Sequence, residues 1–235
     1  MDPTAPKPVI VAHPAHSAPV NFAAVSLEDA LRRAGCAMQL VDHLQAPRRV
    51  QVSIRIGGLD RHVRDLRPEG YRIVRGQGGE PIVSVLARDD AGAMYGTLEL
   101  AEQLRRRGRL DKVAETSASP RFEFRALKFN LPWSSYRMGE PMTLHMDTCR
   151  QHAFWLALLD MMAVNRFNAL TLWNLHPFPY MFRSRSFPEA CPFNDEEMKQ
   201  WQALFRVIFR AARERAIEPY VVWWNIFVSP SFGQA

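Results

Sequence analysis

Polar and aromatic side chains follow three apolar segments in the second half of the chain. Tryptophan offers a flat apolar face to a sugar ring or an aromatic ligand, while Asn, His and Arg form hydrogen bonds with hydroxyl or carboxylate groups. The candidates for ligand binding are Asn130, Arg137, Trp173, Asn174, His176, Trp224 and Asn225. We expect the aromatic run Phe178, Tyr180 and Phe182 to shape the wall beside them. The same mixture after three separate segments predicts a carbohydrate cleft.

These side chains must be positioned by the apolar segments and by the amphipathic segments between them. The apolar segments are 124–132, 169–175 and 218–229, and helices are predicted over 147–168 and 194–216. In the first helix the expected apolar stripe consists of Phe154, Leu158, Met161 and Met162. Asn194 is the expected N-cap of the second helix. Apolar strands alternating with helices indicate parallel βα units covered on both faces.

Parallel βα units belong either to a doubly wound sheet or to a (β/α)₈ barrel. No Gly-rich phosphate loop follows any of the three strands, which argues against nucleotide binding. In barrels the active site is built at the C-terminal ends of the strands. The candidate binding residues lie at these ends.

The first half of the chain has a different pattern. Strands are predicted over 7–15, 48–58, 70–76 and 81–89, and helices over 26–41 and 89–108. Ser26 is the expected N-cap of the first helix, and Gly108 lies at the expected end of the second. These elements predict a small α+β layer, a sheet with helices on one face. The small-residue and proline stretch 114–122 places the domain boundary near residue 118.

Charge and cysteine content narrow the classes of function. The formal charge of +6 raises a nucleic-acid-binding hypothesis, but the dense basic run at 104–110 closes a predicted helix, where cations suit the helix dipole. Three separated cysteines without CxxC spacing, and His13, His16 and His43 without a ligand spacing, predict no metal site and no disulfide scaffold. No cofactor is expected. We see no signal peptide and no apolar run of membrane length, so we expect a soluble cytoplasmic protein without membrane partners.

Two sequence patterns resemble known families of glycoside hydrolases. The first pattern comprises Ala91, Gly92, Tyr95, Gly96, Leu100, Gln103 and Leu104, followed by the strand segment 119–130. The second is the helix–strand segment 154–178. Both resemble family 20 β-hexosaminidases and family 67 α-glucuronidases, in which a small accessory domain precedes a (β/α)₈ barrel.

The resemblance implies a domain layout for the whole chain. It implies a flexible N-terminus over 1–19 with room for a first strand, and an accessory hexosaminidase- or glucuronidase-like α/β domain over 20–118. Residues 119–235 would be the N-terminal part of a TIM-type barrel, with its first three βα units. We therefore expect an α/β protein with an incomplete barrel.

The resemblance also implies where the catalytic carboxylates would be. In both families they lie on the fourth or later barrel strands, so no catalytic residue is assigned here. Asp160, Glu189 and Glu218 are expected to be structural, within a helix, in a loop and at the start of a strand. In family 20 the first barrel strand usually ends in Asp, with an Arg close behind that binds the sugar. This sequence departs from that pattern, with Asn130 at the matching place and Arg137 as the nearest following Arg.

Three βα units leave an open apolar edge, whereas a barrel needs eight strands to remove its edges. We expect the N-terminal portion of a longer glycoside hydrolase, inactive by itself, acting on a carbohydrate when completed by the missing barrel half or a partner chain. Two alternatives remain open. One is a non-catalytic carbohydrate-binding or protein-interaction module, and the other is a basic nucleic-acid-binding protein.

Overall fold

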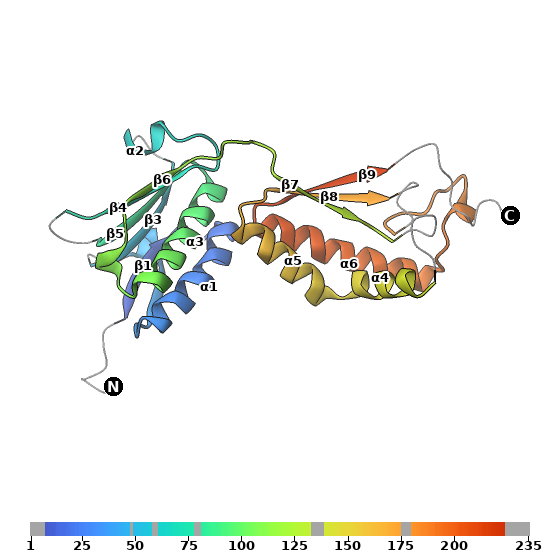
Figure 1. The fold of residues 1–235 in the computed structure, drawn as a ribbon, viewed down its shortest axis with the longest axis horizontal. Helices are drawn as coiled ribbons and strands as arrows, with labels where there is room; N and C mark the ends of the chain where they lie inside the picture. The colour runs from blue at the N-terminus through green and yellow to red at the C-terminus, as the bar shows by residue number, and fades with distance from the viewer. Residues whose placement is uncertain are drawn as a thin grey trace. The chain divides into compact units, whose positions relative to one another are not determined.

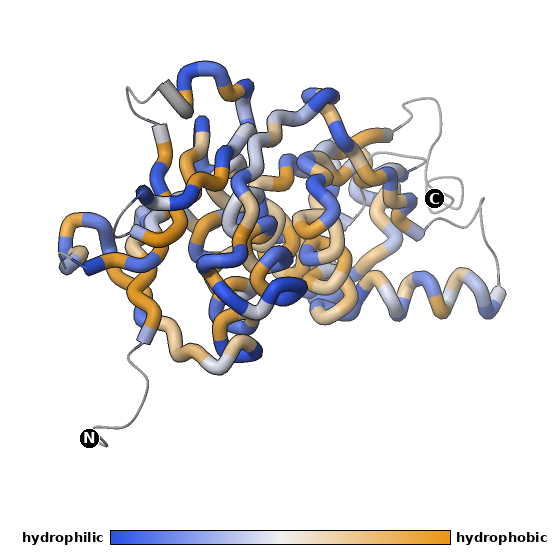
Figure 2. Tube along the Cα trace, turned by 60° about the vertical axis from the view of Figure 1, so that its left-hand side comes forward, coloured by the Kyte–Doolittle hydropathy of each residue, from blue (hydrophilic) through white to orange (hydrophobic). Residues whose placement is uncertain are grey.

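The computed structural model describes residues 8–47, 49–57, 61–77, 81–132, 139–174 and 180–223. The chain divides into two compact units, one of which comprises Met1–Glu123 with Glu214–Ala216 (Figure 1). The other comprises Phe124–Arg213 with Ile217–Ala235. Figure 2 shows hydrophobic and hydrophilic residues interspersed along the chain.

The first unit is built on a six-stranded sheet in the order β2-β1-β3-β5-β4-β6. The strands are β1 Val9–His13, β2 Met38–Asp42, β3 Val52–Ile56, β4 Tyr71–Arg75, β5 Val83–Ala87 and β6 Thr116–Ala118. The first four strands in that order are parallel, and β4 pairs antiparallel with both β5 and β6. The helices are α1 Ala18–Arg33, α2 Arg61–Arg64 and α3 Asp90–Arg107, with short 3₁₀ turns His43–Gln45 and Leu110–Lys112. The long helices α1 and α3 pack against each other on one side of the sheet (Figure 1).

The beginning of this unit differs from the sequence prediction. Helix α1 starts after Ser17, whose hydroxyl caps the helix, and Ser26 lies inside the helix. The helix also ends earlier than expected, because Gly35 adopts a left-handed φ of 77° and the chain turns there. The residues predicted as its last turns form the edge strand β2. Val9–His13 forms strand β1, second in the sheet order, which confirms the first strand predicted over 7–15.

Helix α3 follows its sequence signals more closely. Asp89 caps its N-terminus by accepting from the N–H of Gly92 at 2.9 Å. Gly108 ends it in the left-handed conformation, with φ of 73°, which confirms the predicted end. Tertiary packing explains why two positions in the helix are glycines. A Cβ at Gly92 would lie 2.3 Å from the carbonyl oxygen of Gly70, and a Cβ at Gly96 would lie 2.5 Å from Cγ1 of Val85. Helix α3 therefore approaches the sheet more closely than larger residues allow.

The second unit contains a three-stranded parallel sheet in the order β7-β8-β9. Its strands are β7 Ala126–Asn130, β8 Ala169–Asn174 and β9 Glu218–Trp223. Its helices are α4 Glu140–Arg150, α5 His152–Val164 and α6 Asp195–Glu214, with a 3₁₀ turn at Pro188–Ala190. The predicted alternation of parallel strands and helices is confirmed. Among the described residues the helices cover one side of this sheet, not both (Figure 1).

The predicted helix over 147–168 is two helices in the structure. Gln151 has extended backbone angles and separates α4 from α5. The expected stripe is only partly correct. Met162 is buried as predicted, and Phe154 and Leu158 are half-buried, but Met161 is 41% exposed. The other buried residues of this helix are Trp155, Leu159 and Ala163. Helix α5 is apolar on most of its circumference, so periodicity alone did not distinguish its buried side.

Helix α6 begins as predicted. Asn194 accepts from the N–H of Glu197 at 2.9 Å, and Glu197 accepts from the N–H of Asn194 at 3.0 Å. This reciprocal pair is a capping box, which satisfies two backbone donors at the start of the helix.

Candidate functional site

The register of the parallel sheet aligns the C-terminal ends of its three strands. Asn130 at the end of β7 lies opposite Trp173 in β8, and Asn174 lies opposite Trp223 in β9. The alignment continues past β7, because the N–H of Leu131 donates to the carbonyl oxygen of Trp173 at 2.8 Å. Residues far apart in the sequence are thus brought to one edge of one sheet.

Strand alternation then sorts these residues between the two sides of the sheet. Phe129 contacts Phe154 and Trp155 of α5, with ring centroids 5.7 Å and 4.8 Å away, so its side of the sheet is covered by helices. Neighbours of Phe129 in the strand point to the other side. We call this other side the open face, and it carries Lys128, Asn130, Thr171, Trp173, Tyr220 and Val222.

Two of the predicted binding residues, Asn130 and Trp173, are therefore neighbours on the open face. Asn174 alternates to the helix-covered side, where Leu172 also lies, and it is only 1% exposed. The structure does not bring Asn174 to the same surface as Trp173. The remaining candidates, Arg137, His176, Trp224 and Asn225, lie outside the described residues.

The indole of Trp173 is held by two neighbours on the open face. Its Nε1–H donates to Oγ1 of Thr171 at 3.1 Å. The ammonium of Lys128 lies 4.4 Å from the ring centroid, which is the geometry of a cation–π contact. Sequence analysis overlooked both neighbours. The alternation in the segment Ala126–Asn130 could have shown that Lys128 shares a side with Asn130.

The side-chain oxygen of Asn130 lacks a hydrogen-bond donor among the described residues. This atom, Oδ1, is buried. A buried acceptor without a donor costs about 1–3 kcal/mol, so a hydroxyl or N–H group reaching this atom would be stabilised. The adjacent Trp173 supplies the flat apolar surface that such a ligand needs.

The aromatic residues after β8 have different roles. Tyr180 is 3% exposed, and its hydroxyl donates to the carbonyl oxygen of Pro132. Its ring lies 4.8 Å from that of Trp201 and 5.2 Å from that of Phe193. Tyr180 therefore joins the chain after β8 to the chain after β7, and the expectation that it forms a cleft wall is wrong. Burial raises the pKa of this phenol. Phe182 is 48% exposed, and Phe178 lies outside the described residues.

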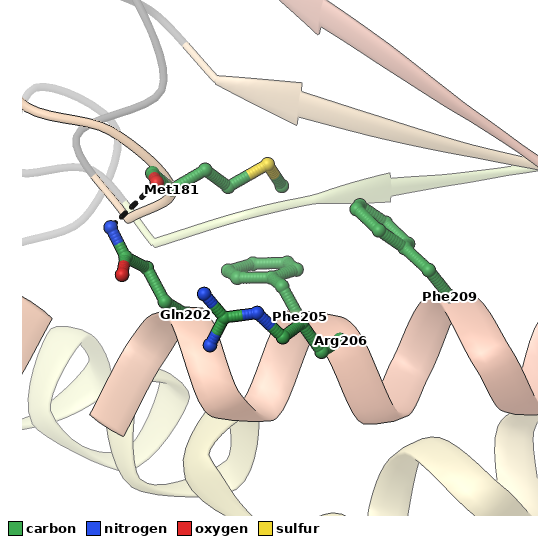
Figure 3. A pocket seen from close by; sticks show the side chains of 5 residues that line it. All are labelled: Met181, Gln202, Phe205, Arg206 and Phe209. Atoms are coloured by element: carbon green, nitrogen blue, oxygen red, sulfur yellow. Dashed lines mark hydrogen bonds between the residues drawn. The ribbon is translucent and has the colours of Figure 1, made fainter. Parts of the chain in front are cut away.

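A hollow of about 230 Å³ lies along α6. It is lined by Met181, Gln202, Phe205, Arg206 and Phe209, and Figure 3 shows the two phenylalanines rising from α6 toward the strands. Gln202 donates to the carbonyl oxygen of Met181 at 3.1 Å, which fixes the chain after β8 over the helix. None of these five lining residues carries a carboxylate, so they form no acid–base pair.

No carboxylate among the described residues lies at the C-terminal end of β7, β8 or β9. The positions predicted for three acidic residues are confirmed, because Asp160 lies within α5, Glu189 in a 3₁₀ turn and Glu218 at the start of β9. Within the described ranges, no group of three or more His, Cys, Asp or Glu side chains could hold a metal ion. The search of the same ranges for a helix long and apolar enough to cross a membrane finds none.

Several solved structures with a similar fold are glycoside hydrolases. No family model and no curated protein matches the sequence. A GH138 enzyme targeting pectin rhamnogalacturonan II has a TM-score of 0.76 and 23% identity over 96% of this chain and 32% of its own. The GH20 β-N-acetylhexosaminidase of Streptomyces coelicolor A3(2) has a TM-score of 0.56 and 18% identity, covering 91% of this chain and 41% of its own.

A third similar structure is a GH115 4-O-methyl-α-glucuronidase with specificity for decorated arabinogalactans. It has a TM-score of 0.51 and 16% identity over 83% of this chain and 28% of its own. The chain thus spans less than half the length of each of these enzymes. At such identities the likeness establishes a common fold, and the predicted resemblance to glycoside hydrolases is confirmed at that level.

Proposed function

We propose that this sequence is the N-terminal portion of a glycoside hydrolase and contributes part of its carbohydrate-binding site. In this proposal, residues 20–118 are the accessory domain, and residues 119–235 supply the first three βα units of a (β/α)₈ barrel. The observation that carries the proposal is the pairing of Asn130 with Trp173 on the open face. It occurs at the C-terminal ends of parallel strands, where barrel enzymes bind their substrates.

Each residue has a role that follows from its chemistry. The indole face of Trp173 stacks against the apolar C–H face of a sugar ring. The Oδ1 of Asn130 accepts a hydrogen bond from a sugar hydroxyl and so gains the partner that it lacks among the described residues. Arg137, His176, Trp224 and Asn225 follow the same strand ends in the sequence, and we propose them as further contacts.

Hydrolysis needs two carboxyl groups flanking the glycosidic bond, one as acid and one as base or nucleophile. The described strand ends supply none, so we propose that both come from residues outside this sequence. The 235 residues alone should bind a carbohydrate without cleaving it. Since the similar structures are carbohydrate-active enzymes, the nucleic-acid and protein-interaction alternatives are not favoured.

Calorimetry on the whole 235-residue chain tests the proposal. The probes are oligosaccharides of rhamnogalacturonan II, N-acetylglucosamine oligomers and glucuronate-decorated arabinogalactan fragments. We expect one class to bind, and Trp173→Ala to weaken binding about tenfold, as loss of an aromatic stacking contact allows. The matched control is Phe122→Ala, which removes an aromatic ring that is 67% exposed and precedes the N-terminal end of β7 in the sequence.

Two results would contradict the proposal. The wild-type chain binding none of the three classes at millimolar concentration would remove the carbohydrate-binding role. Equal weakening by Trp173→Ala and Phe122→Ala would show that binding does not take place on the open face. Separately, turnover of aryl-glycosides well above a no-protein control would show that the chain contains its own catalytic groups.

A further inference from the structure

The indole of Trp173 belongs to a chain of hydrogen bonds on the open face. Its N–H donates to Oγ1 of Thr171 at 3.1 Å, and the Thr171 hydroxyl donates in turn to the carbonyl oxygen of Leu127 at 3.4 Å. A hydroxyl can donate once and accept as well, so Thr171 can form both bonds simultaneously. This series of hydrogen bonds ends at the backbone of the adjacent strand β7, which is held in place by its parallel pairing with β8.

A second restraint acts on the ring itself. Lys128 lies opposite Thr171 in the strand register, two residues before the pair formed by Asn130 and Trp173. From this position its ammonium reaches over the indole, 4.4 Å from the centroid. A hydrogen bond in the plane of the ring and a cation above it restrict both rotation and tilt of the side chain.

We propose that Lys128 and Thr171 are positioning residues that fix the Trp173 indole and select which of its two faces receives a ligand. One face is occupied by the ammonium, so the opposite face is the stacking surface. The indole N–H is already engaged, so Trp173 contributes its ring and no hydrogen bond to the ligand. The identity of the ligand as a carbohydrate rests on the proposed function, whereas the fixed indole does not.

The energetic consequence is pre-organisation. A ring that is already ordered loses less rotamer freedom when a ligand stacks on it. Losing the contact with Lys128 should therefore weaken binding modestly, about threefold, which is the size supported by one cation–π contact at an exposed site. Loss of Trp173 itself should have the larger effect.

Fluorine NMR of the whole chain labelled with 5-fluorotryptophan tests the positioning without any ligand. The sequence has six tryptophans, and Trp173→Phe identifies the resonance of this one. We expect Lys128→Met and Thr171→Val each to shift and broaden that resonance. Lys128→Arg keeps the charge and Thr171→Ser keeps the hydroxyl. In both variants the Trp173 resonance should therefore have its wild-type position and width. Lys199→Met, at an exposed position of α6, is the matched control.

The wild-type chain provides a measurement that does not depend on a variant folding. Hydrogen exchange of the Trp173 indole N–H, followed by proton–nitrogen NMR, should be at least about tenfold slower than that of a free indole, because it donates to Thr171. Free exchange, or a Trp173 resonance insensitive to both Lys128→Met and Thr171→Val, would overturn the proposal.

Oligosaccharide binding separates this inference from the proposed function. A wild-type chain that binds none of the three carbohydrate classes, but shows the expected Trp173 signals, refutes the carbohydrate role and leaves the fixed indole established. If the wild type binds and Lys128→Met binds equally well, the indole is fixed without serving the ligand, and the face-selecting role is refuted.

Discussion

Replacing Gly96 by alanine tests how closely α3 approaches the sheet of the first unit. The new Cβ would lie 2.5 Å from Cγ1 of Val85 and 3.1 Å from Cβ of Tyr71. Carbon atoms pack best at about 3.5–4.0 Å. Val85 is fully buried and branched at Cβ, so its methyl group has no free rotamer to move into.

The expected change in stability follows from two opposing effects. Alanine gains about 1 kcal/mol over glycine in a helix interior. Inserting a carbon into a filled core costs about 1–3 kcal/mol, and a contact of 2.5 Å belongs at or above the top of that range. We therefore expect Gly96→Ala to destabilise the first unit by about 2 kcal/mol.

Hydrogen exchange of the full chain, measured by mass spectrometry, resolves the two units. Amides of β5 and α3 should exchange roughly 30-fold faster in the variant, the factor that corresponds to about 2 kcal/mol. All six tryptophans lie in the second unit, so urea unfolding followed by tryptophan fluorescence reports that unit and is the internal control. Its transition should not change.

The double variant Val85→Ala with Gly96→Ala decides whether the close contact is the cause. Val85→Ala removes the methyl group that the new Cβ of Gly96→Ala would meet. The double variant should therefore lose at least about 1 kcal/mol less unfolding free energy than the two single variants lose in sum. Additive losses, or slower exchange in Gly96→Ala alone, would refute the packing explanation for this glycine.

Three further predictions concern single side chains. Tyr180→Phe removes a buried hydrogen bond to Pro132 and should cost the second unit about 1–2 kcal/mol in urea unfolding. Because burial raises the pKa of Tyr180, the stability that its neutral phenol contributes is present below about pH 10 and declines at higher pH, and this decline should be smaller in the variant. Burial lowers the pKa of His13, so the first unit should lose stability as the pH falls below about 6.5, and His13→Asn should flatten this dependence in exchange of β1 amides. Asn194→Ala removes the N-cap of α6 and should cost about 1 kcal/mol, read from tryptophan fluorescence in urea.

Each of these predictions has a matched control. Tyr220→Phe removes the hydroxyl of a tyrosine that is 44% exposed and should have little effect on stability. His16→Asn, at an exposed position, should leave the acid dependence unchanged. Lys199→Ala, within α6, should not reproduce the loss seen with Asn194→Ala. If stability falls equally at high pH in the wild type and in Tyr180→Phe, the phenol of Tyr180 does not cause that fall. If stability falls equally at low pH in the wild type and in His13→Asn, the imidazole of His13 does not cause it.

Local sequence signals predicted most of the second unit. Strands β7, β8 and β9 fall inside the three apolar segments found from composition and flanking residues. In the second unit the capping signal at Asn194 marks a helix start in the structure, as Gly108 marks a helix end in the first. Strand burial, helix periodicity and capping involve residues close together in the chain, so the sequence contains the necessary information.

The misplaced elements depended on partners distant in sequence. Strand β2 looks like the end of a helix in isolation, and becomes a strand because it pairs in parallel with β1. The break between α4 and α5 at Gln151 carries no glycine or proline. The buried side of α5 depends on contacts such as that between Trp155 and Phe129, since its own sequence is apolar on most sides.

The order of residue types along the chain establishes which side chains stand at the strand ends, and therefore which kinds of ligand contact they can form. Which of these side chains share a surface depends on how the strands pair. Asn130 and Trp173 meet because hydrogen bonding between β7 and β8 sets their register, and Asn174 is separated from Trp173 because adjacent strand residues point to opposite sides. Lys128 became part of the site only through this register, because hydrogen bonding between β7 and β8 brings its ammonium to the indole ring. Thr171 reaches the same ring because residues two apart in one strand share a side.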